Sequence, residues 1–188
     1  MKRGRLIDYG IVAVVAIALA LLVQAFLVKP YRIPSESMAS TLRPGDRVLV
    51  NRVVYRLREP HRGDVMVFRY PEDRSVIFIK RIVGVPGDTL QVRDGHLWVN
   101  GHPVAEPYVH HTAGLSDPTA ASGPLAGSTM REPWSLARPY TVPADAFFVM
   151  GDNRTDSDDS RYWGTVPRAD VIGEGFVVYW PLGHWTTL

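Results

Sequence analysis

Two serines and one lysine are the residues of this sequence whose types and surroundings could support covalent catalysis. Ser35 and Ser37 stand in Ile33-Pro34-Ser35-Glu36-Ser37-Met38, and Lys80 stands in Phe78-Ile79-Lys80-Arg81. A serine hydroxyl is a weak nucleophile until an adjacent base takes its proton, and no histidine of this sequence lies in a recognisable triad setting. At an ordinary pKa of ~10.4 only about 0.04% of a lysine is neutral at pH 7, whereas a pKa lower by ~3 makes roughly a quarter of it neutral. Because apolar residues surround Lys80, the pattern predicts a hydrolase with a serine nucleophile and a lysine base.

The N-terminal region predicts a membrane anchor. Three basic residues in positions 1–6 precede an apolar run from Tyr9 to Val28, in which Gln24 is the one strongly polar residue. About 20 helical residues cross a hydrocarbon core of ~30 Å. We therefore expect residues 7–28 to span the membrane. The basic flank places residues 1–6 in the cytoplasm and residues 29–188 on the extracytoplasmic side.

A cleaved signal peptide is the alternative interpretation of this N-terminal run. The apolar region of a signal peptide is usually ~7–15 residues long and is followed by a small-residue cleavage site. Here Ala18-Leu19-Ala20 lies inside the run, and Lys29-Pro30 follows it. The uncleaved anchor fits these positions better.

Composition excludes several other classes of protein. The chain has 188 residues, a formal net charge of +2 and no cysteine. The small net charge argues against an extended nucleic-acid surface, and the lack of cysteine excludes disulfides and thiolate metal sites. The acidic run Asp156–Asp159 lacks the glycine and the closing glutamate of an EF-hand, and His110-His111 has no third ligand at suitable spacing. No metal and no cofactor are expected.

The residues after the anchor predict a mainly β catalytic domain. Stretches rich in Val, Ile and Phe are bounded by Pro, Gly and Asp, which is typical of strands. The expected strands are Arg47–Tyr55, Asp64–Tyr70, Ser75–Val85, Thr89–Asp94, His96–Val99, His102–Val104, Phe147–Gly151 and Val171–Trp180. Asp94-Gly95 and Asn100-Gly101 suit tight hairpin turns, and Pro30 and Pro34 favour an extended edge.

One stretch of the domain has a different composition. Residues 105–143 are dominated by Pro, Gly, Ala, Ser and Thr. This composition indicates an inserted cap or a surface loop on the β domain and not a second domain. Near the C-terminus, Trp180 and Trp185 suit either the core or a membrane interface.

Three sequence blocks resemble those of bacterial type I signal peptidases, which are Ser/Lys serine proteases. Ile33–Leu42 followed by Gly45-Asp46 resembles the nucleophile block of that family. Arg62–Pro71 and Ile79–Asp88 resemble its lysine block, and Gly151–Gly164 resembles its final block. The blocks come in the family's order behind an N-terminal anchor. One departure is Ser40, which stands where the family usually has proline.

The resemblance implies a role for each matching residue. It implies that Ser37 is the nucleophile, that Lys80 is the general base, and that the Ser35 hydroxyl with the Ser37 backbone N–H forms the oxyanion hole. Ser157 would orient the lysine by a hydrogen bond, and two ion pairs would support this wall of the site, Asp159 with Arg161 and Asp152 with Arg81. The substrate-binding residues implied are Tyr31, Ile33, Pro34, Met38, Leu42, Phe78 and Ile79.

The same resemblance implies a biological setting. The protein would sit in the bacterial cytoplasmic (inner) membrane as a single-pass enzyme and cleave signal peptides from exported preproteins after small residues at −1 and −3. Membrane lipid is then an expected partner and the secretion machinery a further one, whereas no nucleic acid is expected. A substrate could pair with the extended Tyr31–Pro34 edge as an added strand.

Three alternatives are weighed against this interpretation. A self-cleaving repressor of similar β fold would carry DNA-binding helices instead of an anchor. A penicillin-binding or β-lactamase-like enzyme needs Ser-x-x-Lys, but Ser40 stands three residues after Ser37. A non-enzymatic anchored binding module with the same fold would be expected to lose Ser37 or Lys80, and both are present.

Overall fold

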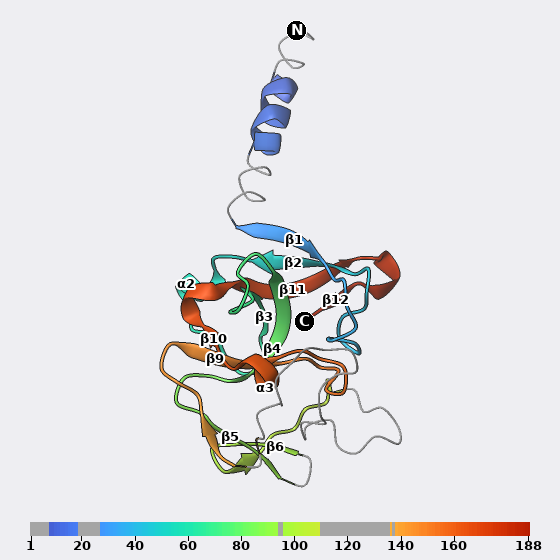
Figure 1. The fold of residues 1–188 in the computed structure, drawn as a ribbon. Coiled ribbons are helices and arrows are strands. Elements are labelled where there is room, and N and C mark those ends of the chain that lie inside the picture. Colours follow the sequence, from blue (N-terminus) through green and yellow to red (C-terminus); the bar gives the residue numbers. More distant parts are fainter. Residues whose placement is uncertain (1–7, 19–26, 94–95, 110–135, 137) are drawn as a thin grey trace.

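A computed structural model describes residues 8–18, 27–93, 96–109, 136 and 138–188 of the chain. Residues 8–18 are helical, and the rest of the described chain forms a mainly β body built from two antiparallel sheets (Figure 1). The mainly β prediction is therefore confirmed. Within the described residues, no helix has both the length and the apolar character required to cross a membrane.

The larger sheet has eight strands. Its order is β1-β2-β11-β3-β4-β9-β10, and β12 pairs with β11. The bounds of these strands are β1 Val28–Arg32, β2 Arg47–Asn51, β3 Val65–Arg69, β4 Ile77–Gly84, β9 Ala146–Met150, β10 Val166–Pro167, β11 Val171–Trp180 and β12 Thr186–Thr187. Among the described strands, β1 lies at an edge and pairs only with β2, whereas β4 lies inside the sheet between β3 and β9.

The second sheet holds four strands in the order β7-β6-β5-β8. They are β5 Thr89–Arg93, β6 His96–Val99, β7 His102–Pro103 and β8 Tyr140–Thr141. The predicted Asn100-Gly101 turn is confirmed, with φ of 53° and 81° at its two residues, as a tight hairpin turn requires. The predicted Asp94-Gly95 turn lies outside the described residues.

Short helical turns complete the fold. They are α2 Val54–Leu57, α3 Ser160–Trp163, and the 3₁₀ turns η1 Arg168–Asp170 and η2 Leu182–His184. The expected strand Arg47–Tyr55 was wrong in its second half, because β2 ends at Asn51 and α2 follows. The Asn51 side chain accepts hydrogen bonds from the backbone N–H groups of Val53 and Val54 at 3.0 and 3.1 Å. Such a side-chain cap turns the chain out of the ladder.

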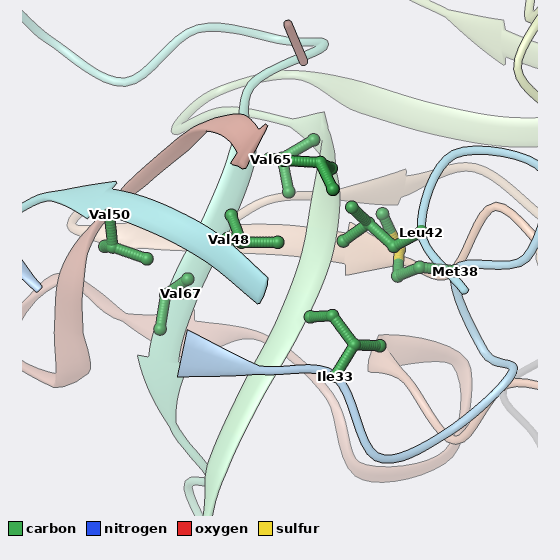
Figure 2. Packing of buried hydrophobic residues seen from close by; sticks show 8 residues of the cluster. Ile33, Met38, Leu42, Val48, Val50, Val65 and Val67 are labelled. Carbon is green, nitrogen blue, oxygen red and sulfur yellow. The ribbon is translucent and has the colours of Figure 1, made fainter. Parts of the chain in front are cut away.

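The larger sheet packs one face around an aliphatic cluster that joins it to the segment after β1. Ile33, Met38 and Leu42 come from that segment, and Val48, Val50, Val65, Val67 and Val178 come from β2, β3 and β11 (Figure 2). Met38 and Leu42 have no exposed surface. Burial of a side chain of this size stabilises a fold by ~1.5–3 kcal/mol, so these residues hold the loop that contains Ser35 and Ser37 against the sheet.

The ends of the predicted cap at residues 105–143 belong to the fold. Leu136 and Val142 are buried in a cluster with Leu90, Leu97 and Phe148, and β8 adds a strand to the second sheet. Residues 110–135 and 137, including His110 and His111, lie outside the described residues. The interpretation of the whole stretch as a cap stays a prediction.

Candidate active site

The lysine and the serine singled out from the sequence meet in the structure. Lys80 lies in β4 opposite Met66 of β3, and Ser37 lies in the loop after β1. The Nζ of Lys80 donates a hydrogen bond to the Oγ of Ser37 at 2.5 Å. Residues 43 positions apart in the sequence are thus within proton-transfer distance. The aliphatic cluster under Met38 fixes one partner, and the sheet fixes the other.

The surroundings of Lys80 suit a general base. Its side chain is buried, with 4% of its surface exposed. Burial is the main cause that lowers the pKa of Lys80 to about 8, Arg161 adds to this, and the carboxylates of Asp159 and Asp158 oppose it. At that pKa about one tenth of the lysine is neutral at pH 7, compared with well under 0.1% for an ordinary lysine.

Ser35 stands beside Ser37 on the exposed side of the candidate site. Its Oγ lies 3.2 Å from the Oγ of Ser37. Ser35 is exposed and Ser37 is half-buried. A hydroxyl that lies next to the nucleophile and faces open space can donate to an oxygen of a bound substrate.

Asp159 organises the polar wall behind the lysine. Its carboxylate accepts two hydrogen bonds from the Arg161 guanidinium at 2.8 and 2.9 Å and one from the Arg161 backbone N–H at 3.2 Å. It also accepts one from the Ser157 hydroxyl at 2.7 Å and one from the Gly151 N–H at 3.0 Å. Burial opposes ionisation of Asp159, but the Arg161 guanidinium and these hydrogen bonds hold its pKa below the usual range. The wall therefore carries a fixed negative charge that Arg161 balances.

Ser157 lies beside the nucleophile loop, but its hydroxyl donates to Asp159 and not to the lysine. A Cβ added to Gly151 would stand 2.2 Å from the Oγ of Ser157 and 2.3 Å from the carbonyl oxygen of Ser37. The absence of a side chain at Gly151 thus lets the two serine segments approach each other. The predicted lysine-orienting role of Ser157 stays a prediction.

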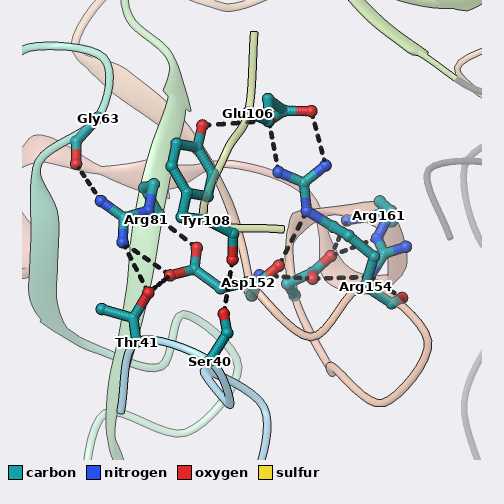
Figure 3. Close-up of polar contacts among 11 residues, drawn as sticks. Ser40, Thr41, Gly63, Arg81, Glu106, Tyr108, Asp152, Arg154 and Arg161 are labelled. Atoms are coloured by element: carbon teal, nitrogen blue, oxygen red, sulfur yellow. Dashed lines mark hydrogen bonds and ion pairs between the residues drawn. The ribbon is translucent and has the colours of Figure 1, made fainter. Parts of the chain in front are cut away.

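A second buried ion pair ties the nucleophile loop to the sheet (Figure 3). Arg81 donates to the two oxygens of Asp152 at 2.8 and 2.7 Å and to the carbonyl of Gly63 at 2.7 Å. The Thr41 hydroxyl donates to Asp152 at 2.5 Å. Arg81 follows Lys80 and Thr41 lies four residues after Ser37, so this pair fixes both sides of the dyad.

Comparison with known proteins shows the family of this chain. The family model described as "Signal peptidase, peptidase S26" matches residues 6–180. The chain belongs to the peptidase S26 family. Membership makes the protein a hydrolase, a serine endopeptidase.

Relatives match over nearly the full chain. Signal peptidase I of Pseudomonas aeruginosa is 38% identical over 213 residues, which cover 96% of this chain and 75% of the relative. Signal peptidase I of Mycobacterium tuberculosis (strain H37Rv) is 35% identical, with 98% and 76% covered. The crystal structure of a signal peptidase I from Enterococcus faecalis V583 is 30% identical, has a TM-score of 0.47, and covers 62% of this chain and 97% of that chain.

The structure also places near the candidate site three residues whose contacts the sequence analysis missed. Arg154 is fully buried and forms a two-pronged ion pair with Glu106. The ring of Tyr108 lies over the Arg81 guanidinium, 4.1 Å from its centre, and the Tyr108 hydroxyl donates to Glu106. Residues 106 and 108 belong to the predicted cap, whose composition gave no sign that one of its glutamates would pair with a buried arginine.

Ser40 connects the segment that contains Glu106 and Tyr108 to the loop that contains Ser37. Its hydroxyl donates to the carbonyl of Tyr108 at 2.6 Å, and its φ is 88°. Proline, which the family usually has here, is fixed near −65° and could not adopt this conformation. The departure at Ser40 thus coincides with a backbone conformation and a side-chain hydrogen bond that proline cannot provide.

Side chains with an implied substrate role divide into two groups. Ile33, Met38 and Leu42 are buried in the aliphatic cluster, where they support the loop. The others, Tyr31, Pro34, Phe78 and Ile79, keep exposed surface. A shallow pocket of about 590 Å³ lies beside this edge, lined by Arg32, Ile33, Pro34, Pro44 and Gly45. Substrate contact of all seven residues stays a prediction.

The acidic run after Asn153 lies among cationic groups. Within the described part of the chain, no three acidic or histidine side chains gather closely enough to hold a metal ion. Asp158 and Asp159 instead surround the lysine and the Arg161 guanidinium.

Proposed function

We propose that the protein is a membrane-anchored signal peptidase that cleaves signal peptides from exported preproteins with Ser37 as nucleophile and Lys80 as base. The observation that carries the proposal is the 2.5 Å contact between the buried Lys80 Nζ and the Ser37 Oγ. The names and family of the relatives support the substrate class.

The chemistry follows from the geometry of the dyad. Neutral Lys80 takes the Ser37 proton as Oγ attacks the scissile carbonyl carbon, and the Ser35 hydroxyl donates to the oxyanion. Lys80 then gives the proton to the leaving amine, and the C–N bond breaks to form an acyl-enzyme. In the second half, Lys80 takes a proton from water as the water oxygen attacks the ester carbon. The ester C–O bond then breaks, and Lys80 returns the proton to the Ser37 Oγ, which leaves a free carboxyl terminus and the starting dyad.

Substrate binding uses the edge strand in this proposal. β1 has a free edge in the described sheet because it pairs only with β2. An extended signal-peptide segment can pair with the chain at Tyr31–Pro34 and present alternate side chains to the surface. Small residues at −1 and −3 would suit the shallow pocket beside Ile33 and Pro34.

Anchoring through residues 7–28 completes the proposal. The described helix at residues 8–18 exposes six large hydrophobic side chains, between 59% and 68% of each: Tyr9, Ile11, Val12, Val14, Val15 and Ile17. A helix that is apolar on all sides requires an apolar environment. The basic N-terminal flank favours an extracytoplasmic catalytic domain on the bacterial inner membrane, within reach of the secretion machinery.

The test uses the full chain in detergent micelles with a preprotein whose signal sequence ends in Ala-x-Ala. Ser37→Ala and Lys80→Ala should each abolish cleavage, and the double variant should be hardly worse than either single variant because the two residues act as one unit. Thr89→Val, which removes a hydroxyl from the second sheet, is the matched control and should cleave normally. Substantial turnover by Ser37→Ala would reject the dyad, and no cleavage by the wild-type chain would favour a binding module.

A further inference from the structure

A basic pocket lies beside the start of β1, away from the dyad. Its volume is about 630 Å³, and neither Ser37 nor Lys80 lines it. Six cationic side chains line it and no carboxylate does: Lys29, Arg52, Arg56, Arg69, Arg74 and Arg168. A concentration of like charge around one concavity creates a strong positive potential, which calls for an anionic occupant.

Only part of this charge is balanced by the protein. Arg74 pairs with the buried Asp170 at 2.9 Å, and Arg168 pairs with the exposed Glu59 at 2.5 Å. Among the described residues, no carboxylate forms an ion pair with Lys29, Arg56 or Arg69.

Tyr31 supports the positive character of the pocket. Burial raises the pKa of its phenol, and the charges of Arg52 and Arg69 act in the opposite direction. Both guanidinium groups therefore favour a negative charge at the Tyr31 hydroxyl, and Tyr31 lines the pocket. Guanidinium groups bind phosphate oxygens with two parallel hydrogen bonds. A pocket lined by several arginines and by no carboxylate therefore suits a phosphate ligand.

The position of the pocket next to the proposed membrane anchor favours a lipid phosphate over other phosphate-containing ligands. Leu27, Lys29 and Tyr31 line it, and they lie at or directly after the end of the proposed anchor at residue 28. Headgroups occupy ~5–8 Å on each side of the hydrocarbon core. Because a strand rises ~3.3 Å per residue, residues 29 and 30 lie at headgroup depth even if the strand runs straight away from the membrane, and residue 31 lies at its outer limit. Ile77, 43% exposed, and Leu27, 41% exposed, add apolar surface to the rim.

We propose that this pocket binds the phosphate of an anionic phospholipid headgroup, with Arg56, Arg69 and Lys29 as the binding cations. The proposal rests on the membrane anchoring in the proposed function. Free inorganic phosphate offers the same chemistry, but a free anion would make no use of the apolar rim or of a site at headgroup depth. A bound lipid would fix the rotation of the catalytic domain at the membrane surface.

The test measures lipid binding to the full chain in neutral detergent micelles by native mass spectrometry. Phosphatidylglycerol and phosphatidylcholine are added separately, and inorganic phosphate is added as a competitor. The double variant Arg56→Gln/Arg69→Gln is compared with Arg93→Gln/Arg138→Gln, which removes two exposed arginines from the region of the second sheet. We expect about 30-fold weaker phosphatidylglycerol binding by the first variant only, at ~5-fold per cation near an anionic surface.

Each other outcome overturns the proposal. Equal loss in both variants would indicate a general charge effect, and equal binding of phosphatidylcholine would remove the anionic preference. Full displacement of phosphatidylglycerol by an equal concentration of phosphate would assign the pocket to a free anion instead of a lipid.

Two further measurements separate this result from the proposed function. Ser37→Ala should bind phosphatidylglycerol like the wild-type chain, since neither Ser37 nor Lys80 lines the pocket. Arg56→Gln/Arg69→Gln should cleave a preprotein normally in lipid-free detergent. Cleavage by Ser37→Ala would reject the catalytic proposal and leave the lipid result standing.

Discussion

Burial of Lys80, the proposed general base, should lower the stability of the folded protein, and Lys80→Met is the substitution that reveals this cost. The ordinary pKa of 10.5 falls to about 8 in the folded chain. At ~1.36 kcal/mol per pKa unit, the protonated lysine therefore destabilises the fold by about 3 kcal/mol. Methionine keeps an unbranched apolar side chain without the charge. Loss of the hydrogen bond to Ser37 offsets ~1 kcal/mol, which leaves a net gain of about 2 kcal/mol.

The pH dependence of this gain has a definite direction. Below pH 8 the lysine is protonated in both the folded and the unfolded chain, so the cost is fully present. Between about pH 8 and 10.5 the folded chain binds fewer protons than the unfolded chain, and the stability of the wild-type protein rises with pH. The stability advantage of Lys80→Met over the wild type should therefore shrink through this window. Above it the advantage should reverse to a deficit of ~1 kcal/mol, because only the loss of the hydrogen bond to Ser37 remains.

Paired thermal melts of the full chain in detergent provide the measurement. At pH 6–7 we expect Lys80→Met to be inactive and to melt ~4–8 °C above the wild type, given ~2–4 °C per kcal/mol for a chain of this size. Lys29→Met is the matched control, because Lys29 is exposed, and it should show no such pH-dependent difference. A Lys80→Met variant that is less stable at every pH would refute the desolvation argument.

Three other predictions concern the rate of cleavage. The kcat/KM should rise with pH around a midpoint of about 8, where Lys80 loses its proton; a flat profile from pH 6 to 9 would contradict this. Ser35→Ala should lower kcat by ~10²–10³ with little change in KM, Ser35→Thr should lose less, and an unchanged kcat would place the oxyanion hole elsewhere. Gly151→Ala should lower both activity and melting temperature, because its Cβ would stand 2.3 Å from the Ser37 carbonyl. Gly183→Ala, whose Cβ would meet nothing within 4 Å, is its control.

Sequence patterns predicted most of the strands and singled out Ser37 and Lys80, which the structure places in contact, because both depend on strong local signals. Stretches rich in Val, Ile and Phe define β3, β4 and β11, and the Asn-Gly pair defines one hairpin. Lys80 stood out because a charge inside an apolar strand needs a reason. These are properties of contiguous residues, which a sequence shows directly.

Contacts between distant segments could not be predicted in the same way. Glu106 meets Arg154 and Tyr108 covers Arg81 only after two loops have folded against each other. Nothing in the composition of residues 105–143 distinguishes a glutamate that will neutralise a buried arginine from one in solvent. The boundary error after Asn51 has a similar origin, because a side-chain cap competes with continued strand pairing.

The carboxylates near the lysine explain how burial can produce a useful base. Burial alone would push the pKa of Lys80 further down and make the amine a weaker base, whereas Asp159 and Asp158 oppose that effect. Burial also raises the pKa of Asp158 to about 6, so near neutral pH Asp158 still carries most of its charge. A base is most effective when its pKa lies near the working pH. The segment from Ser157 to Arg161 therefore contributes to catalysis in this proposal by setting the charge around Lys80, without any contact to the substrate.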